Sequence, residues 1–492
     1  MVITFHNALL IFSLLLFFAI LAGKTSSRIG VPALILFLGI GMLAGSEGIG
    51  KIEFGYEQAE IAQFIGTAAL CFILFSGGLD TKWSAIKPVI GKGVTLSTLG
   101  VLLTAFFIGL FVKCVTNFSW AESFLLGSIV SSTDAAAVFN ILNAQNLSLK
   151  NNLKPLLEFE SGSNDPVAFL LTIFFVGMVK NADFSLPLAL LHFLLQLFLG
   201  AFMGFAMGKF STIVINRIRI SYSGLYPVLA IALMLFTYSF TDFIGGNGFL
   251  AVYISAIVLG NKRLTRRSAI VSSFDGYAWL MQLILFLSLG LLVFPSEVWK
   301  IKWTGLLISA FIILLGRPLA VFLCLLFFKK TPAKDQIFIS WVGLRGAAPI
   351  VFATYPLVAG LQKSNAIFSI VFFISFLSMA LQGTSIPWVA RKLHLAIILP
   401  SGLMARRNID SKTEMFEIEI EKNSPLVGKT LLEAGLPEKT RITMILRHGD
   451  YIVPVGDTRL QQKDYLYILC KDPKEIKRLL ATGEEEPKPK KA

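Results

Sequence analysis

Long apolar blocks alternate with short polar loops along most of the chain. A helix needs ~20 mostly apolar residues to cross the ~30 Å hydrocarbon layer of a bilayer, and blocks suited to this follow one another up to residue 393. They predict thirteen membrane-spanning helices, at residues 5–22, 31–46, 59–79, 94–114, 121–143, 153–179, 185–215, 222–242, 246–260, 273–294, 303–328, 335–356 and 364–390. The pattern therefore predicts an all-α polytopic membrane protein.

The pattern changes after this transmembrane domain of residues 1–393. A polar linker is expected at 394–414 and a small α+β domain at 415–480, and the charged segment 481–492 is expected to be disordered. Alternation with a period of two predicts strands in the small domain at Phe416–Ile420, Ile442–Leu446 and Tyr465–Leu469, and a helix is expected at Leu431–Ala434.

The positive charges fall mainly in alternate loops. Loops after odd-numbered segments contain eighteen Lys and Arg residues, whereas loops after even-numbered segments contain six. Because short cytoplasmic loops are enriched in Lys and Arg, this bias predicts that the N-terminus is outside and the small domain is cytoplasmic. The net charge is +14, but no basic cluster is interleaved with aromatic residues, so nucleic acid is not an expected partner.

Four charged residues lie in the middle of apolar segments. Counted from the membrane surface at which each helix begins, Asp134, Asp165, Arg317 and Arg345 lie about 15–21 Å deep at ~1.5 Å per residue. A charge at that depth costs about 2.5–3.5 kcal/mol, so each of the four is a candidate functional residue. Structural alternatives remain open, because an aspartate can cap a restarted helix and an arginine can belong to a buried ion pair.

Two of the predicted helices are interrupted. Residues 121–143 contain the polar run Ser131–Asp134, and residues 335–356 contain Gly343 and Pro349. The two segments are seven helices apart and run in opposite directions. Crossed broken helices of this kind occur in transporters with inverted repeats, so we expect six helices, one linker helix and six more.

Three motifs resemble those of bacterial monovalent cation:proton antiporters, in particular the NhaP or cell-volume-regulation K⁺/H⁺ type. They are SSTDAAAVF at Ser131–Phe139, EFESGSNDP at Glu158–Pro166 and WVGLRGAAP at Trp341–Pro349. The small domain resembles the C-terminal subdomain of regulators of K⁺ conductance (RCK_C, also called TrkA-C), at Ser424–Lys429 and Val455–Thr458.

The antiporter resemblance implies an ion-binding site at the first break. It makes Asp165 the carboxylate that binds a proton and a cation alternately, and Asn164 and Ser161 stabilise this site. Thr133 helps to ligate the ion, and Asp134 beside it is a further candidate. One titratable aspartate next to a neutral asparagine predicts one proton per cation and hence electroneutral exchange.

The resemblance also implies two supporting contacts and shows one departure. Glu160 is expected to pair with Arg317, and Arg345 is expected to support the second break. Related antiporters often have an acidic residue before Gly-Gly-Leu in the third helix, where this chain has Ser76. Asp80, four positions further on, is near the predicted cytoplasmic end of that helix.

The function implied by the resemblance is exchange of K⁺, or Na⁺, for H⁺ across a bacterial cytoplasmic (inner) membrane. Such exchange serves cation, pH and cell-volume homeostasis. RCK_C domains commonly form dimers and bind a small regulator, in some relatives a cyclic dinucleotide, so a regulated homodimer is expected. A purely structural dimerisation domain is the alternative.

Other classes of protein fit the sequence less well. A regulated K⁺ channel would be expected to have a filter such as Thr-Val-Gly-Tyr-Gly, which the sequence lacks. An enzyme is not indicated, because the four histidines are scattered, and neither a metal site nor a cofactor is expected. The Gly-rich run from Gly39 to Gly45 lies inside a predicted helix, so it is interpreted as a helix-packing surface.

The departure in the third helix gives the first prediction. If Ser76 has displaced the acidic contact of related proteins, Asp80→Asn retains part of the cation/proton exchange of reconstituted protein. Dissipation of a pH gradient in proteoliposomes measures this, and complete loss of exchange would show that Asp80 has taken over the acidic role.

Overall fold

The computed structural model describes residues 5–29, 32–180, 185–218, 220–328, 331–398, 414–420, 424, 426–436, 440–447, 450–462 and 464–470. It divides into two compact units, Met1–Ile397 and Ile398–Ala492. Most of the predicted linker 394–414 and all of the predicted disordered tail 481–492 lie outside the described residues.

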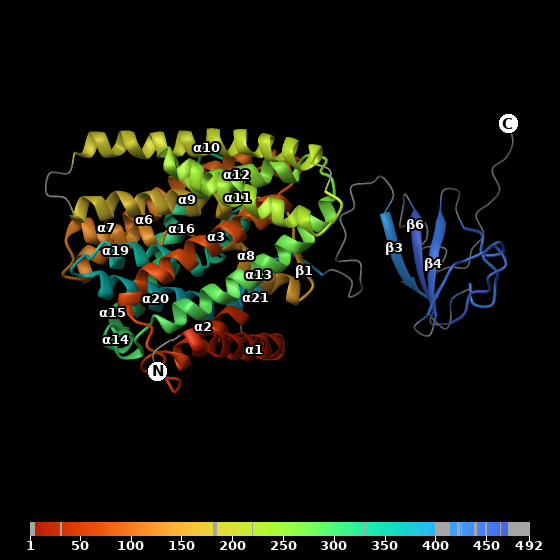
Figure 1. Ribbon diagram of the computed structural model, residues 1–492, viewed down its shortest axis with the longest axis horizontal. Helices are drawn as coiled ribbons and strands as arrows, with labels where there is room; N and C mark the ends of the chain where they lie inside the picture. The colour runs from red at the N-terminus through yellow and green to blue at the C-terminus, as the bar shows by residue number, and fades with distance from the viewer. Residues whose placement is uncertain are drawn as a thin grey trace. The chain divides into compact units, whose positions relative to one another are not determined.

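The first unit is a bundle of helices, many of which run roughly parallel or antiparallel to one another (Figure 1). Its amino-terminal part contains α1 (Phe5–Ile29), α2 (Ala33–Ala44), η1 (Tyr56–Gln58), α3 (Ala59–Asp80), α4 (Trp83–Ile86), α5 (Ile90–Thr95), η2 (Leu96–Gly100), α6 (Val101–Val115), α7 (Trp120–Ile129), α8 (Ala135–Ala144), β1 (Leu147–Leu149) and α9 (Leu153–Lys180). The following part contains α10 (Leu186–Arg217), α11 (Leu225–Phe243), α12 (Gly248–Gly260), α13 (Arg267–Leu291), α14 (Pro295–Lys300), α15 (Lys302–Phe311), η3 (Ile312–Gly316), α16 (Arg317–Leu325), α17 (Ala333–Trp341), α18 (Ala347–Phe352), α19 (Thr354–Val358), α20 (Ser364–Ser378), η4 (Met379–Gly383), α21 (Thr384–Lys392) and β2 (Ala396–Ile398). Strand β2 pairs with β1.

Each of the thirteen predicted segments overlaps at least one of these helices. Among the described residues, eight helices are long and apolar enough to cross a membrane: Tyr56–Asp80, Ile90–Val115, Leu153–Lys180, Leu186–Arg217, Leu225–Phe243, Arg267–Leu291, Lys302–Leu325 and Ser364–Lys392. Five apolar helices are shorter: Leu9–Lys24, Ala33–Ala44, Ala135–Ala144, Gly248–Gly260 and Ala347–Val358. The described residues therefore form a helical membrane protein.

Both predicted interruptions are present in the structure. Helices α7 and α8 are separated by residues 130–134, and α17 and α18 by residues 342–346. By contrast, α9 continues from Leu153 to Lys180 with Pro166 inside it. The alternative that Asp165 caps a restarted helix is therefore wrong, because no helix begins there.

Three long helices contain a π-helical turn of five residues. These turns are η2, η3 and η4. A π-helical turn changes the direction of the side chains around it, and such turns are often found at functional sites. Turns η2 and η3 belong to the fourth and eleventh predicted segments, which are seven segments apart like the two broken helices.

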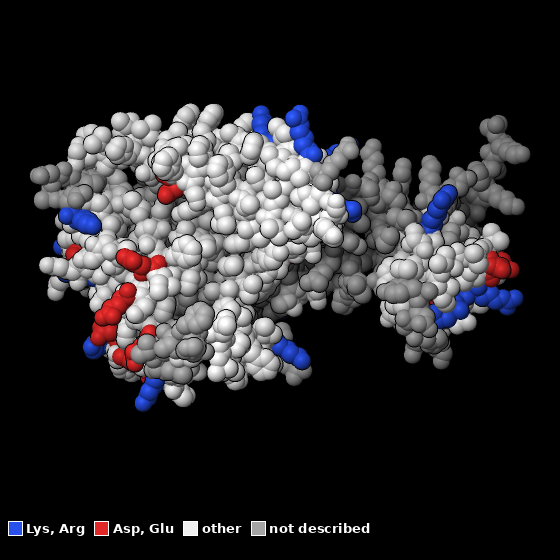
Figure 2. Space-filling model, in the orientation of Figure 1, with Lys and Arg blue, Asp and Glu red and all other residues white. Residues whose placement is uncertain are grey.

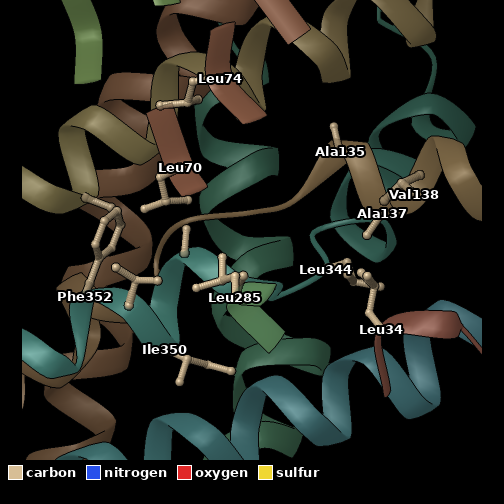
Figure 3. Packing of buried hydrophobic residues seen from close by; sticks show 14 of the residues in the cluster. Leu34, Leu70, Leu74, Ala135, Ala137, Val138, Leu285, Leu344, Ile350 and Phe352 are labelled. Atoms are coloured by element: carbon tan, nitrogen blue, oxygen red, sulfur yellow. The ribbon is translucent and has the colours of Figure 1, made fainter. Parts of the chain in front are cut away.

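The helices pack as two sets. Helices α1, α2, α3, α10, α11, α12 and α13 pack mainly on one another, and the second set contains α5–α9, α15–α18, α20 and α21 with their π-helical turns. A single apolar core extends through both sets. Figure 3 shows part of this core, including Ala135, Ala137 and Val138 of α8 and Leu344 of the second break. Because this packing surrounds both breaks, it fixes their positions.

Charged side chains are distributed unevenly on the first unit. Figure 2 shows Lys, Arg, Asp and Glu gathered toward its two ends, with a largely uncharged band between them. Leu, Phe and Ile side chains of α10 are exposed on the surface, among them Leu190, Leu194 and Phe198. An uncharged band with exposed apolar side chains is what contact with lipid tails requires.

The second unit contains a four-stranded antiparallel sheet in the order β3-β6-β4-β5. Its strands are β3 (Glu414–Glu419), β4 (Arg441–Arg447), β5 (Asp450–Ile452) and β6 (Tyr465–Cys470). The three strands predicted from the sequence are confirmed within a few residues, whereas the short strand β5 was not predicted. The helix expected at Leu431–Ala434 is wrong: these residues form turns, tied to the segment 456–458 by backbone hydrogen bonds.

One buried ion pair holds this small domain together. Arg447 Nη2 lies 2.8 Å from Asp464 Oδ2, and the Asp464 carboxylate is fully buried. Hydrogen bonding to Asp464 raises the pKa of the Arg447 guanidinium.

The expected packing role of the Gly39–Gly45 run is confirmed at Gly41. A Cβ at this position would lie 2.5 Å from Leu287 O and 2.9 Å from Gly290 Cα of α13. The helices α2 and α13 therefore approach so closely that only glycine fits.

This close contact gives a prediction about stability. We expect Gly41→Val to lower the thermal stability of the purified protein, because overpacking typically costs about 1–3 kcal/mol. Gly39→Val is the matched control on the same helix, since no atom lies within 4 Å of a Cβ at Gly39. Equal melting temperatures for the two variants would contradict the packing argument.

Candidate ion-binding site

The first break is stabilised by side chains of its own and of α9. Asp134 caps α8, because its Oδ1 accepts a hydrogen bond from the Ala137 N–H at 3.0 Å. Ser161 bridges the break from α9: its hydroxyl donates to Thr133 O at 2.8 Å and accepts from the Ala135 N–H at 2.9 Å. The backbone at the break therefore remains hydrogen-bonded although no helix continues through it.

Asp165 faces this break from the middle of α9. Its side chain is buried, and the Ser132 hydroxyl donates a hydrogen bond to its Oδ1. Next to it, Asn164 Nδ2 donates to Thr133 Oγ1 at 2.5 Å, while Asn164 Oδ1 is buried without a donor among the described residues. The structure thus brings a carboxylate and several neutral oxygen atoms together at the break.

The second break lies against the first. The Asp134 N–H donates to Leu344 O at 2.8 Å, which joins the two extended segments directly. A Cβ at Gly346 would overlap the Asp134 carboxylate, so this glycine allows the close approach. The two breaks therefore contact each other through a direct hydrogen bond.

Arg345 lies fully buried between the breaks. Its Nη1 donates to Ser131 O at 2.8 Å and to Ser132 O at 2.7 Å. These carbonyl groups follow the C-terminal end of α7, where the helix dipole is negative, so a cation is favoured there. Its Nε and Nη2 have no acceptor among the described residues. Arg345, a residue of the second break, therefore holds the backbone of the first break in place.

Glu160 and Arg317 form a separate buried pair. Arg317 Nη2 contacts Glu160 Oε1, and the two side chains are 2% and 1% exposed. Both residues belong to the second set of helices, Glu160 on α9 and Arg317 at the start of α16. Glu160 lies more than one turn before Asp165 on α9, so this pair links α9 to α16 rather than contributing a ligand to Asp165.

Two relevant residues were not among the predicted site residues. Ser132 was noticed only as part of a polar run, although its hydroxyl is the group that contacts Asp165. Asp275 on α13 was not considered, yet Ser76 Oγ lies 3.4 Å from its Oδ1. Ser76, which stands where related proteins often have an acidic residue, therefore has an acidic neighbour on another helix. No spacing in the sequence could indicate this contact. Asp80, in comparison, is the last residue of α3.

The Glu160–Arg317 pair gives a prediction about stability. Replacing one partner, as in Glu160→Leu, leaves a buried charge unpaired and is expected to cost about 3–5 kcal/mol. The double variant Glu160→Leu/Arg317→Met removes both charges and should recover most of this loss. Thermal unfolding in detergent compares the variants, and a double variant less stable than either single one would contradict the pairing.

Known proteins agree with this arrangement. Residues 13–392 match the transmembrane sodium/hydrogen exchanger family, and residues 415–481 match the TrkA-C domain. The chain is 37% identical over 485 residues to the K⁺/H⁺ antiporter NhaP of Alkalimonas amylolytica, a match that covers 96% of this chain and 83% of the relative. It is 35% identical over 470 residues to the K⁺/H⁺ antiporter NhaP2 of Shewanella sp. strain ANA-3, covering 94% and 81%.

A solved structure has a similar fold. The sodium proton antiporter MjNhaP1 of Methanocaldococcus jannaschii, determined at pH 8, matches with a TM-score of 0.69 and 24% sequence identity. The match covers 79% of this chain and 99% of that one. Together with the sequence matches, it shows that the chain belongs to the family of transmembrane sodium/hydrogen exchangers and has a TrkA-C domain after its membrane part.

Proposed function

We propose that the protein exchanges K⁺ for H⁺ across the bacterial cytoplasmic membrane, with Asp165 as the carboxylate that binds them alternately. The observation that supports this most directly is the buried position of Asp165 beside the first break. Relatives at 35–37% identity over most of the chain are named K⁺/H⁺ antiporters, which favours K⁺ over Na⁺. Antiporters are transporters, so an enzymatic activity is not proposed.

The surroundings of Asp165 suit a dehydrated monovalent cation. Such an ion needs oxygen atoms in place of its water shell, and Asn164 Oδ1, Thr133 and Ser132 supply neutral oxygens next to the carboxylate. We assign Thr133 and Asn164 to ion binding together with Asp165. Ser161 and Asp134 hold the break in place, with Asp134 close enough to add negative charge.

Coupling follows from competition at one carboxylate. A bare charge in the membrane interior is costly. The Asp165 carboxylate therefore passes from one side's access to the other's only while a proton or a cation is bound to it. One proton is then exchanged for each cation, so no net charge is moved and exchange is electroneutral. Arg345 and the Glu160–Arg317 pair serve as structural support.

Alternating access needs relative movement of the two sets of helices. The sets meet where α12 packs on α9 around Asp165: Asn247 Nδ2 donates to Pro166 O at 3.0 Å, and the Tyr253 ring leaves no room for a Cβ at Gly162. We propose that the set holding both breaks moves as a rigid body along this surface. Thirteen spanning helices in a 6+1+6 inverted repeat complete this proposal.

Orientation and regulation are extensions of the same proposal. The loop charges support an external N-terminus and a cytoplasmic TrkA-C domain. We infer that this domain regulates exchange in a homodimer by binding a small ligand, for which a cyclic dinucleotide is the candidate.

Replacing the carboxylate tests the proposal. Asp165→Asn keeps the shape of the side chain but binds no proton, so exchange in proteoliposomes should fall to background while the protein still folds. Dissipation of a pH gradient on addition of K⁺ or Na⁺ measures exchange, with and without a membrane potential.

A matched control is available in the same unit. Asp335 is also a buried aspartate, and it lies in the first turn of α17, where it accepts hydrogen bonds from Asn151 Nδ2 at 3.1 and 3.3 Å. Asp335→Asn should retain exchange. Substantial exchange by Asp165→Asn, or a voltage-driven current without proton movement, would refute the assignment.

A further inference from the structure

The last long helix of the first unit presents a row of polar side chains to the second break. Ser378, Gln382 and Ser385 follow at spacings of four and three residues around the π-helical turn η4, and Ser378 and Gln382 are almost fully buried. Polar groups buried in a membrane-spanning helix are costly unless they are hydrogen-bonded within the protein. All three contact the segment around residues 341–345.

The contacts involve backbone groups that the break leaves without helical partners. The Arg345 N–H donates to Ser378 Oγ at 2.9 Å, and the Ser378 hydroxyl donates to Gln382 Oε1 at 2.5 Å. Gln382 Nε2 in turn donates to Trp341 O at 2.7 Å. Ser378 and Gln382 together therefore connect Arg345 in the second break to Trp341, the last residue of α17 before it.

The first break has a corresponding device on its own following helix. There, Ser161 donates to Thr133 O and accepts from the Ala135 N–H. Each broken helix is thus held by a serine on the next long helix, the half-buried Ser161 on α9 and the buried Ser378 on α20. A support that occurs at both breaks is more than the chance packing of one polar residue.

We propose that Ser378 and Gln382 are positioning residues of the ion site, acting on Asp165 through Arg345 and Ser132. Gln382 and Ser378 hold the backbone of Arg345, whose guanidinium holds the carbonyl groups of Ser131 and Ser132. The Ser132 hydroxyl then donates to Asp165. Hydrogen bonds connected through Arg345 and Ser132 therefore lead from the last helix to the Asp165 carboxylate.

The effect on transport rests on the proposed function, whereas the effect on the breaks does not. We therefore combine two measurements on Ser378→Ala. The first is the K⁺ concentration for half-maximal exchange in proteoliposomes, expected to rise roughly 2- to 30-fold, as for network residues that touch no ligand. The maximal rate should change less. The second is backbone hydrogen–deuterium exchange, expected to quicken over both residues 341–346 and residues 130–134.

The same helix provides matched controls. Ser375 is fully buried, and its hydroxyl has no partner among the described residues, so Ser375→Ala should change neither measurement. Ser378→Thr keeps the hydroxyl and should restore both. If Ser378→Ala does not give monodisperse protein, Gln382→Met, which keeps the serine, is measured in the same way and should have the same effects.

Particular results would overturn the proposal. Faster hydrogen exchange at 341–346 alone would show that Ser378 supports only its own break. An unchanged K⁺ dependence in a protein that exchanges K⁺ would show that the network does not reach the ion site. If the wild-type protein transported no cation at all, the proposed function would fail. The hydrogen–deuterium exchange of residues 130–134 in Ser378→Ala would still decide whether the two breaks are coupled.

Discussion

Every backbone N–H and C=O group withdrawn from water in a membrane needs a partner within the protein. This protein interrupts two helices in its interior and therefore creates several such groups at once. Ser161 forms hydrogen bonds with backbone groups of the first break, and Ser378 and Gln382 do so at the second. The hydrogen bond from the Asp134 N–H to Leu344 O satisfies a backbone group of each break. These side chains make the broken helices of the proposed ion site tolerable inside a membrane.

The same breaks arrange the charges. The negative end of α7 attracts the Arg345 guanidinium, which stays near the break but donates to carbonyl groups rather than to Asp165. Arg317 is engaged by Glu160. Both arginines thus have their own partners, and among the described residues the Asp165 carboxylate accepts a hydrogen bond from the Ser132 hydroxyl alone. A carboxylate without a bound arginine remains available to a proton or a metal cation.

The two sets of helices divide the work of the molecule. One set contains both breaks and all the residues assigned to ion binding, and the other provides the surface of α12 against which α9 lies. One contact across this surface is the hydrogen bond from Asn247 Nδ2 to Pro166 O. Movement there would expose Asp165 to a different side without disturbing the hydrogen bonds that shape its site.

The sequence by itself determined the helical segments, the position of both breaks and three strands of the small domain, and it singled out Asp165 as a candidate, because long apolar blocks and local motifs depend on neighbouring residues. It left open whether Asp165 caps a helix, and it missed Ser132, Asp275, Ser378 and Gln382. These depend on which helices lie side by side and on a π-helical turn that redirects side chains. Only tertiary packing decides such contacts, since their partners are separated by 33 to 199 residues.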